Sequence, residues 1–229
     1  MADAKNEADR GQDPKAVKRR RLSPEDRERM IVDGAIHYFA EHGFDGETRA
    51  LANSIGVSQA LIFHYFPTKE ALIDRVYQDV FLSRWKDQWV EIIGDRSRSL
   101  RSRLKEFYRD YYATGDRPEW IRITLYSALR DIDINSRYHA RVREHIIKRI
   151  ALELREELGI RNVEGPSTDN EEQMVYCLHS SVIYQLIRKH IYRMDAPDDM
   201  TPIIDANVDL FMNSIPLVLQ GFVGGQPAP

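Results

Sequence analysis

Residues 48–67, TRALANSIGVSQALIFHYFP, decide how this chain folds, and they predict a helix-turn-helix. Leu51 and Ile55 are apolar at helical spacing, which indicates the inward face of a first short helix. Gly56 follows them and suits the positive φ at which a helix ends and the chain turns sharply. Ser58 can then cap the N-terminus of a second helix.

In such a unit the first helix supports the second, whose N-terminal residues reach base edges in the DNA major groove. Ile62 and Tyr65 would give the second helix its inward face, at i and i+3. An ordinary helical hairpin in an all-α core is the alternative reading of the turn taken alone. The flanking sequence therefore has to discriminate between the two.

The flanking segments make this unit resemble a known family. Upstream, RERMIVDGAIHYFAEHGF reads as a helix that ends at Gly43, and downstream TKEAL restarts a helix with Thr68 as its N-cap. Residues 28–80 resemble the DNA-binding domain of the TetR family of transcriptional repressors, through AEHGF, TRALA, GVS, HYF and TKEAL in that order. Two departures are visible: the segment after Phe44 is one residue shorter than usual, and Phe63 stands where many members carry a tyrosine whose hydroxyl contacts phosphate.

The motif and the resemblance together indicate which residues meet DNA. Gln59 and Ala60, at the exposed start of the second helix, suit an adenine edge and a thymine methyl group. Lys69, in the first turn of the next helix, suits a phosphate. The full predicted DNA-binding set is Thr48, Arg49, Ser58, Gln59, Ala60, Phe63, His64, Tyr65, Lys69, Arg19, Arg20 and Arg21.

Residues 1–23 form a charged leader in which the basic residues gather just before the first expected helix. Arg19, Arg20 and Arg21 are the end of this basic cluster. We expect an arm that is disordered when free and is ordered by DNA phosphates when bound. An inert, solvated leader is the alternative.

The composition predicts a cytoplasmic protein with two domains. The chain has 229 residues and a net charge of −3, so its basic charge is local rather than general. Cys177 is the only cysteine, which rules out an internal disulfide and weakly indicates a reducing compartment. No apolar run reaches the roughly 18 residues of a transmembrane helix, so no membrane association is expected. No catalytic, metal-binding or cofactor-binding motif is present, so we expect neither an enzyme nor a bound cofactor or metal.

Every segment beyond the motif reads as helix, so the predicted fold class is all-α. A three-helix helix-turn-helix DNA-binding domain is expected at residues 24–70, before a larger helical ligand-binding and dimerisation domain at 71–221 and a flexible tail at 222–229. The helices expected after the motif cover residues 68–93, 97–114, 118–131, 135–158, 168–194 and 201–220.

The last two expected helices form the predicted dimer interface. A helix-turn-helix needs a partner to read two half-sites, and TetR-like proteins dimerise through their last two long helices. Burial within the same subunit is the alternative reading of these apolar residues. The residues assigned to the interface are Val175, Leu178, Val182, Leu186, Phe211, Ile215 and Val218.

The middle helices are rich in aromatic residues, and in this family the central helices enclose an effector pocket. Such a pocket would suit a small apolar or aromatic molecule that one or two hydroxyl groups orient. Core packing is the alternative for any single ring. The predicted ligand-binding residues are Trp85, Trp89, Tyr108, Tyr111, Tyr112, Tyr126, Cys177 and His179.

Two classes of function follow from these features. The leading one is a homodimeric, ligand-responsive repressor that binds double-stranded DNA at an inverted-repeat operator. It would release this operator on binding a small apolar or aromatic effector. The alternative is a helical protein-binding adaptor that has a TetR-like fold and no specific operator.

Overall fold

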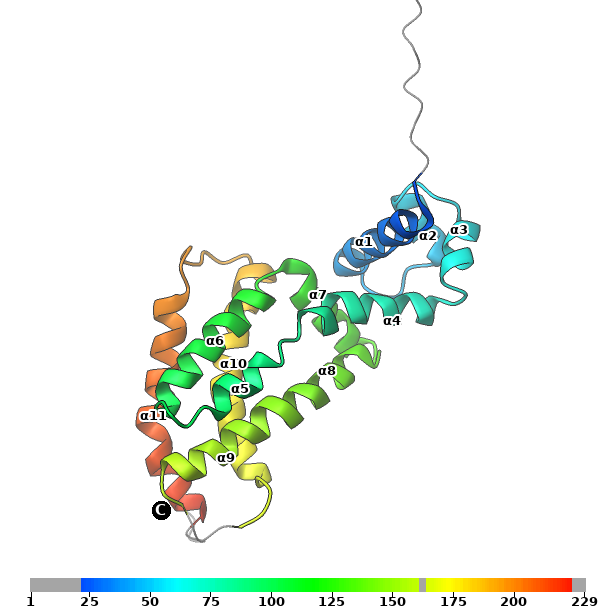
Figure 1. Ribbon diagram of the computed structural model, residues 1–229. Helices are drawn as coiled ribbons and strands as arrows, with labels where there is room; N and C mark the ends of the chain where they lie inside the picture. Colours follow the sequence, from blue (N-terminus) through cyan, green and yellow to red (C-terminus); the bar gives the residue numbers. More distant parts are fainter. Residues whose placement is uncertain (1–21, 161–163, 224–229) are drawn as a thin grey trace, which may run out of the picture.

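The computed structural model of the chain, which describes residues 22–160 and 164–223, contains only helices within those ranges, so the all-α prediction is confirmed. Figure 1 shows a small unit, α1–α3, that α4 joins to a larger bundle. The helices in chain order are α1 (Pro24–His42), α2 (Thr48–Ser54), α3 (Gln59–Tyr65), α4 (Lys69–Val80), η1 (Leu82–Arg84), α5 (Gln88–Gly94), α6 (Leu100–Gly115), α7 (Pro118–Leu129), α8 (Ile134–Val142), η2 (Arg143–Ile147), α9 (Lys148–Glu157), α10 (Asp169–His190) and α11 (Thr201–Val223).

The N-terminal unit is built on one apolar stripe of α1. Ile31, Ala35 and Phe39 recur at i, i+4 and i+8 and are buried. Gly34 lies where α1 meets the end of α2, and a Cβ atom there would clash with the side chain of Ile55. The absence of a side chain at this position therefore lets the two helices pack closely. No sequence signal indicated this role of Gly34.

The prediction of a single long helix over residues 68–93 is wrong. After α4 the chain forms the short helix η1 and an extended residue, Trp85 (φ −65°, ψ 130°), before α5 begins. Two other helices differ less from expectation. The helix expected over 135–158 contains the π-helical turn η2, and α10 ends at His190 rather than at residue 194.

The break after α4 has a cause in tertiary packing. Phe81 is buried and packs against Tyr138 of α8, with ring centroids 5.0 Å apart. Trp89 of α5 is also buried, and its indole N–H donates a hydrogen bond to Asp110 of α6 over 2.7 Å. The break allows the two rings to pack against different helices, and such contacts outweigh local helix propensity.

In the larger bundle, α10 packs against α6, α7, α9 and α11. The expected capping box begins α10: Glu171 N donates to Oγ1 of Thr168, and Thr168 N donates to the Glu171 carboxylate over 2.7 Å. α11 lies along α6, where Arg101 and Lys105 each donate to Asp209 over 2.7 Å. These ion pairs attach α11 to its own subunit along the α6 side.

The N-terminal unit contacts the bundle through α7 and α8. The ring of Tyr126 on α7 lies against Gly43, where a Cβ atom would be 3.1 Å from Cδ1 of the tyrosine. Arg137 on α8 donates to Asp74 of α4 over 2.8 Å, and its guanidinium lies 4.2 Å from the ring centroid of Tyr77. A displacement of α7 or α8 would therefore act directly on α1 and α4.

Candidate nucleic-acid interface and ligand cavity

The second helix of the motif, α3, presents one exposed face. Ser58 caps it as expected, because its Oγ accepts a hydrogen bond from Leu61 N over 3.2 Å. Ile62 is 1% exposed and fixes the inward face, with the half-buried Tyr65 beside it. The first turn of α3 is thus held by its cap and by its buried residue. Its exposed side chains are Gln59, Ala60, Phe63 and His64.

Lys69 has an internal role that its sequence position did not indicate. Its ammonium donates to the backbone carbonyl oxygens of Phe44 and Gly46, the latter over 3.0 Å. An ammonium has three donors, so these two bonds leave one for another acceptor. Lys69 therefore joins the start of α4 to the turn before α2, and its contact with a DNA phosphate stays a prediction.

The short segment before α2 is organised by backbone and ion-pair contacts. Glu47 occupies the N-cap position without a side-chain capping hydrogen bond, and Asp45 pairs with Arg130 at the end of α7. Thr48 is half-buried and Arg49 exposed at the start of α2, close in sequence to this segment. The three remaining members of the predicted DNA-binding set lie outside the described residues: Arg19, Arg20 and Arg21.

A cavity of about 380 Å³ lies among α6, α7, α8 and α10. Of the eight predicted ligand-binding residues, Tyr111 and His179 line it. The lining contains no Asp, Glu, Lys or Arg. Its residues are Tyr111, Trp120, Ile121, Thr124, Leu125, Ala128, Asn135, Tyr138, His139, Tyr176, His179, Ser180, Ile183, Tyr184 and Ile187.

Burial favours the neutral forms of four titratable groups in this cavity, two histidines and two tyrosines. Burial lowers the pKa of His179 to about 3, and neighbouring His139 contributes to that shift. Burial also lowers the pKa of His139. The hydroxyls of Tyr111 and Tyr138 share a hydrogen bond of 3.0 Å, and burial raises the pKa of both groups. The cavity therefore offers hydrogen-bonding groups without charge.

His179 contributes an atom that no protein group satisfies. Its Nδ1 is buried and has no hydrogen-bond partner among the described residues. A buried polar atom that is unpaired costs free energy, so a hydrogen-bonding group placed beside it would be favourable. His179 was predicted from the sequence, but Ile121, Thr124 and Ile183 were not. The pattern of an apolar helical stripe does not distinguish residues that line a cavity from residues of a packed core.

The other six predicted ligand-binding residues do not line this cavity. Trp89 is buried and donates its indole N–H to Asp110. The guanidinium of Arg141 lies over the ring of Trp85, 4.6 Å from the ring centroid. Tyr126 faces the N-terminal unit, as described above, and Cys177 is exposed. Tyr108 and Tyr112 are buried in the core. Core packing, the alternative interpretation, accounts for the five buried or half-buried rings: Trp85, Trp89, Tyr108, Tyr112 and Tyr126.

The residues expected at the dimer interface divide into two groups. The α10 stripe faces the interior of its own subunit because α10 lies at the centre of the bundle, which corrects the expectation for these four: Val175, Leu178, Val182 and Leu186. On α11, Ile215 is buried, Phe211 half-buried and Val218 exposed. Among the side chains that the structure describes, the large apolar ones that α11 exposes are Ile203, Leu210, Leu217 and Val218.

The described part of the chain shows neither a cluster of metal ligands nor a membrane-spanning helix. Among the residues it describes, His, Cys, Asp and Glu side chains nowhere come together in threes as metal ligands would. Of the helices in residues 22–160 and 164–223, none combines the length and the apolar character needed to cross a membrane.

Comparison with known proteins points to one family. Residues 31–76 match the model of bacterial regulatory proteins of the tetR family. The chain is 51% identical over 100 residues to the HTH-type transcriptional repressor Rv1474c of Mycobacterium tuberculosis, which is 43% of this chain and 48% of that protein. It is 32% identical over 103 residues to the HTH-type transcriptional repressor AcnR of Corynebacterium diphtheriae, 43% of this chain and 47% of the relative. The chain thus spans about half the length of these curated relatives.

Solved structures resemble the whole chain in fold. A putative transcriptional regulator from Pseudomonas aeruginosa PAO1 matches with a TM-score of 0.61 at 20% identity, over 88% of this chain and 95% of that one. A TetR-like transcriptional regulator from Rhodococcus sp. RHA1 matches with a TM-score of 0.58 at 20% identity, over 89% of this chain and all of that one. At this identity the likeness concerns the fold alone.

Proposed function

We propose that this chain, whose residues 31–76 match the model of bacterial regulatory proteins of the tetR family, is a DNA-binding transcriptional regulator, and specifically a repressor. The observation that carries this proposal is the geometry of α3. A capped helix is anchored by Ile62 and turns Gln59, Ala60 and His64 outward at its surface. That arrangement suits insertion of the helix N-terminus into a major groove.

The exposed side of α11 supports a homodimer. Ile203, Leu210 and Leu217 are spaced seven residues apart, so they lie along one side of the helix. Their side chains are exposed although they are large and apolar, and contiguous apolar surface marks interaction sites. A second copy of the chain that covers this side would also supply the second recognition helix that an inverted-repeat operator requires.

The effector that releases the operator is, in this proposal, a small neutral molecule with an apolar or aromatic body. The support is the uncharged cavity, whose apolar walls carry a few hydroxyl and imidazole groups. α7 connects this cavity to the DNA-binding unit: Ile121 and Leu125 line the cavity, while Tyr126 contacts Gly43 after α1. A ligand that binds the displaced form of α7 more tightly would lower DNA affinity, with a coupling of about 1–3 kcal/mol.

Selection from a randomised DNA library tests the proposed function. We expect the wild type to select an inverted repeat, because two recognition helices related by a two-fold axis read two half-sites. Gln59→Ala should relax the preference at one base position of each half-site and cost about 1–3 kcal/mol there, since glutamine can bond an adenine edge bidentately. Lys69→Ala is the comparison, and should weaken binding to all sequences about equally.

Two results of this selection would count against the proposal. Recovery of no preferred sequence by the wild type would favour the adaptor function. An unchanged preference in Gln59→Ala would show that α3 does not meet bases through its first turn.

Filling the cavity tests the proposed effector. We expect 1-naphthol, a small aromatic alcohol, to bind the wild type in a calorimetric titration. Ile183→Trp should weaken this binding at least about tenfold, because the larger side chain occupies the space. Leu129→Trp is the matched control, since Leu129 is exposed on α7 and does not line the cavity. Equal affinity in both variants would place the probe elsewhere, and no binding to the wild type would argue against an aromatic effector.

A further inference from the structure

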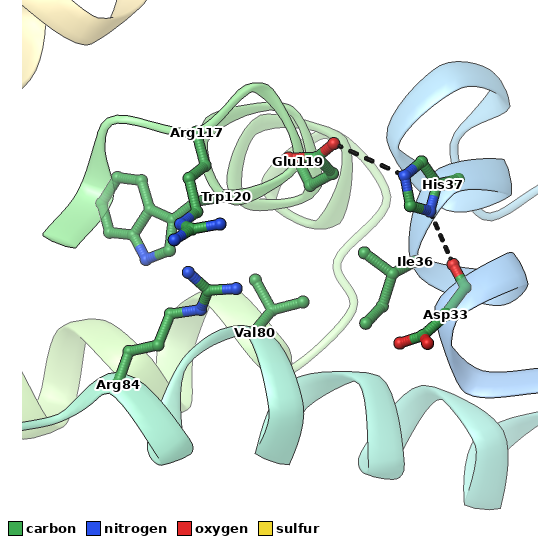
Figure 2. A pocket seen from close by; sticks show the side chains of 8 residues that line it. All are labelled: Asp33, Ile36, His37, Val80, Arg84, Arg117, Glu119 and Trp120. Carbon is green, nitrogen blue, oxygen red and sulfur yellow. Dashed lines mark hydrogen bonds and ion pairs between the residues drawn. The ribbon is translucent and has the colours of Figure 1, made fainter. Parts of the chain in front are cut away.

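A second cavity, of about 220 Å³, lies at the joint between the N-terminal unit and the bundle. Figure 2 shows that three segments line it: α1, the end of α4 with η1, and the start of α7. Arg84 of η1 and Arg117 at the start of α7 point toward one another into this space. It is a site separate from the neutral cavity, because charged residues line it: the two arginines and also Asp33 and Glu119.

The two arginines have no carboxylate partner among the described residues, whose ion pairs include neither of them. The Nε of Arg84 is also buried without a hydrogen-bond partner within the described part of the chain. Burial lowers the pKa of the Arg84 guanidinium and the positive charge of Arg117 lowers it further, while the charges of Glu119 and Asp79 act in the opposite direction. Two like charges thus face one another in a partly enclosed space, which is unfavourable unless an anion joins them.

The carboxylates nearby are engaged elsewhere or lie at the other end of the cavity. Glu119 faces His37, with 3.8 Å between Oε1 and Nε2, as Figure 2 shows. Asp79 pairs with Arg75 over 3.4 Å. Asp33 is exposed and lies with His37 on the α1 side of the cavity, away from the arginines.

The space on the other side of the arginines does not supply a partner either. A hollow of about 350 Å³ there is lined by the same two arginines together with Lys86 and Asp110. Asp110 accepts hydrogen bonds from Lys86 and from the indole of Trp89, each over 2.7 Å. Its carboxylate is therefore already satisfied by its own neighbours.

We propose that Arg84 and Arg117 form a binding site for a small anion that carries a phosphate or carboxylate group. A guanidinium presents paired N–H donors that match two oxygens of such a group, so two guanidiniums can hold one anion from both sides. The cavity has room for an anion the size of inorganic phosphate or a four-carbon dicarboxylate. The bound anion would join η1, where the chain leaves α4, to the first turn of α7.

Calorimetric titration of the full chain with inorganic phosphate, and separately with succinate, tests this site at constant ionic strength. We expect the wild type to bind at least one of the two anions. Arg84→Gln and Arg117→Gln should each weaken that binding about tenfold or more, since each removes one charge-assisted partner. Arg122→Gln is the matched control, because Arg122 is half-buried on α7 and does not line the cavity.

Thermal unfolding gives a second readout that does not depend on DNA binding. Without the anion, both cavity variants should unfold no earlier than the wild type, because each removes a like-charge repulsion. With the anion, the unfolding temperature of the wild type and of Arg122→Gln should rise, and that of the two cavity variants should not. If only phosphate, or only succinate, raises the unfolding temperature of the wild type, that result identifies the chemical group that the site binds. Equal anion affinity in all four proteins, or no binding of either anion to the wild type, would overturn the proposal.

Discussion

Leu210→Asp should convert the protein into a folded monomer that no longer holds an operator. Leu210 is 69% exposed at the middle of the α11 stripe that Ile203 and Leu217 continue. A second subunit that covers this stripe would bury the new carboxylate without a partner, which costs several kcal/mol, or roughly a hundredfold or more in dimer affinity. Sedimentation at micromolar concentration measures the dimer, and titration of the selected operator measures DNA binding.

Two comparisons make this result specific. Leu129→Asp places the same charge at an equally exposed leucine of α7 and should leave a dimer that binds DNA. Val182→Arg alters a residue that the sequence assigned to the interface but that is buried within its own subunit, so it should destabilise the subunit itself. A Leu210→Asp protein that stays dimeric would show that α11 is not the interface. A monomeric wild type with full operator affinity would show that no dimer is needed.

The contrast between Val182 and Leu210 shows where inference from the sequence stops. Both residues are apolar at helical spacing, and that periodicity establishes only that a side of a helix is covered. Whether the cover is another helix of the subunit or a second copy depends on where the helix lies in the bundle. Because α10 lies among four other helices, its stripe is buried within the subunit, whereas the main contacts of α11 in the described part of the chain are with α6 and α10.

The helix-turn-helix was predictable because its signals are local. Ser58 caps α3, Gly56 has a φ of 71°, and Ile62 is buried, all as adjacent residues indicated. The break near Trp85 was not predictable by the same means. It arises from contacts of rings with residues distant in the chain, such as that of Trp89 with Asp110.

The lining of the neutral cavity was predictable only in part. Two of the residues that were predicted to bind a ligand, Tyr111 and His179, line the cavity, and their role in ligand binding stays a prediction. Trp89 has the same kind of side chain on a neighbouring helix, yet it is part of the packed core. The pair of Arg84 and Arg117 had no sequence signal at all, because residues of either charge are common on helix surfaces and only the tertiary structure brings these two together.

Glu153→Gln should lower the free energy of unfolding by about 3–5 kcal/mol, because it leaves a buried arginine without its counter-charge. Glu153 on α9 is 1% exposed and accepts hydrogen bonds from Arg103 and Arg96, both over 3.0 Å. Arg149 lies 3.3 Å from its other oxygen. Arg103, itself buried, comes from α6, so the carboxylate joins α6 to α9. Urea unfolding at neutral pH measures the loss, and Glu156→Gln, one turn onward and exposed, should cost far less.

The same carboxylate makes stability depend on pH in a direction that can be checked. Burial alone would raise the pKa of Glu153, but the hydrogen bonds from Arg96 and Arg103 outweigh it and hold the pKa below its ordinary value. A carboxyl group whose pKa is lower in the folded state stabilises the fold above its unfolded pKa, and this contribution is lost as the pH falls through the folded pKa. The wild type should therefore lose more stability than Glu153→Gln as the pH is lowered from 7 through the glutamate range. Parallel losses in the two proteins would mean that Glu153 is not held as an anion by its arginines.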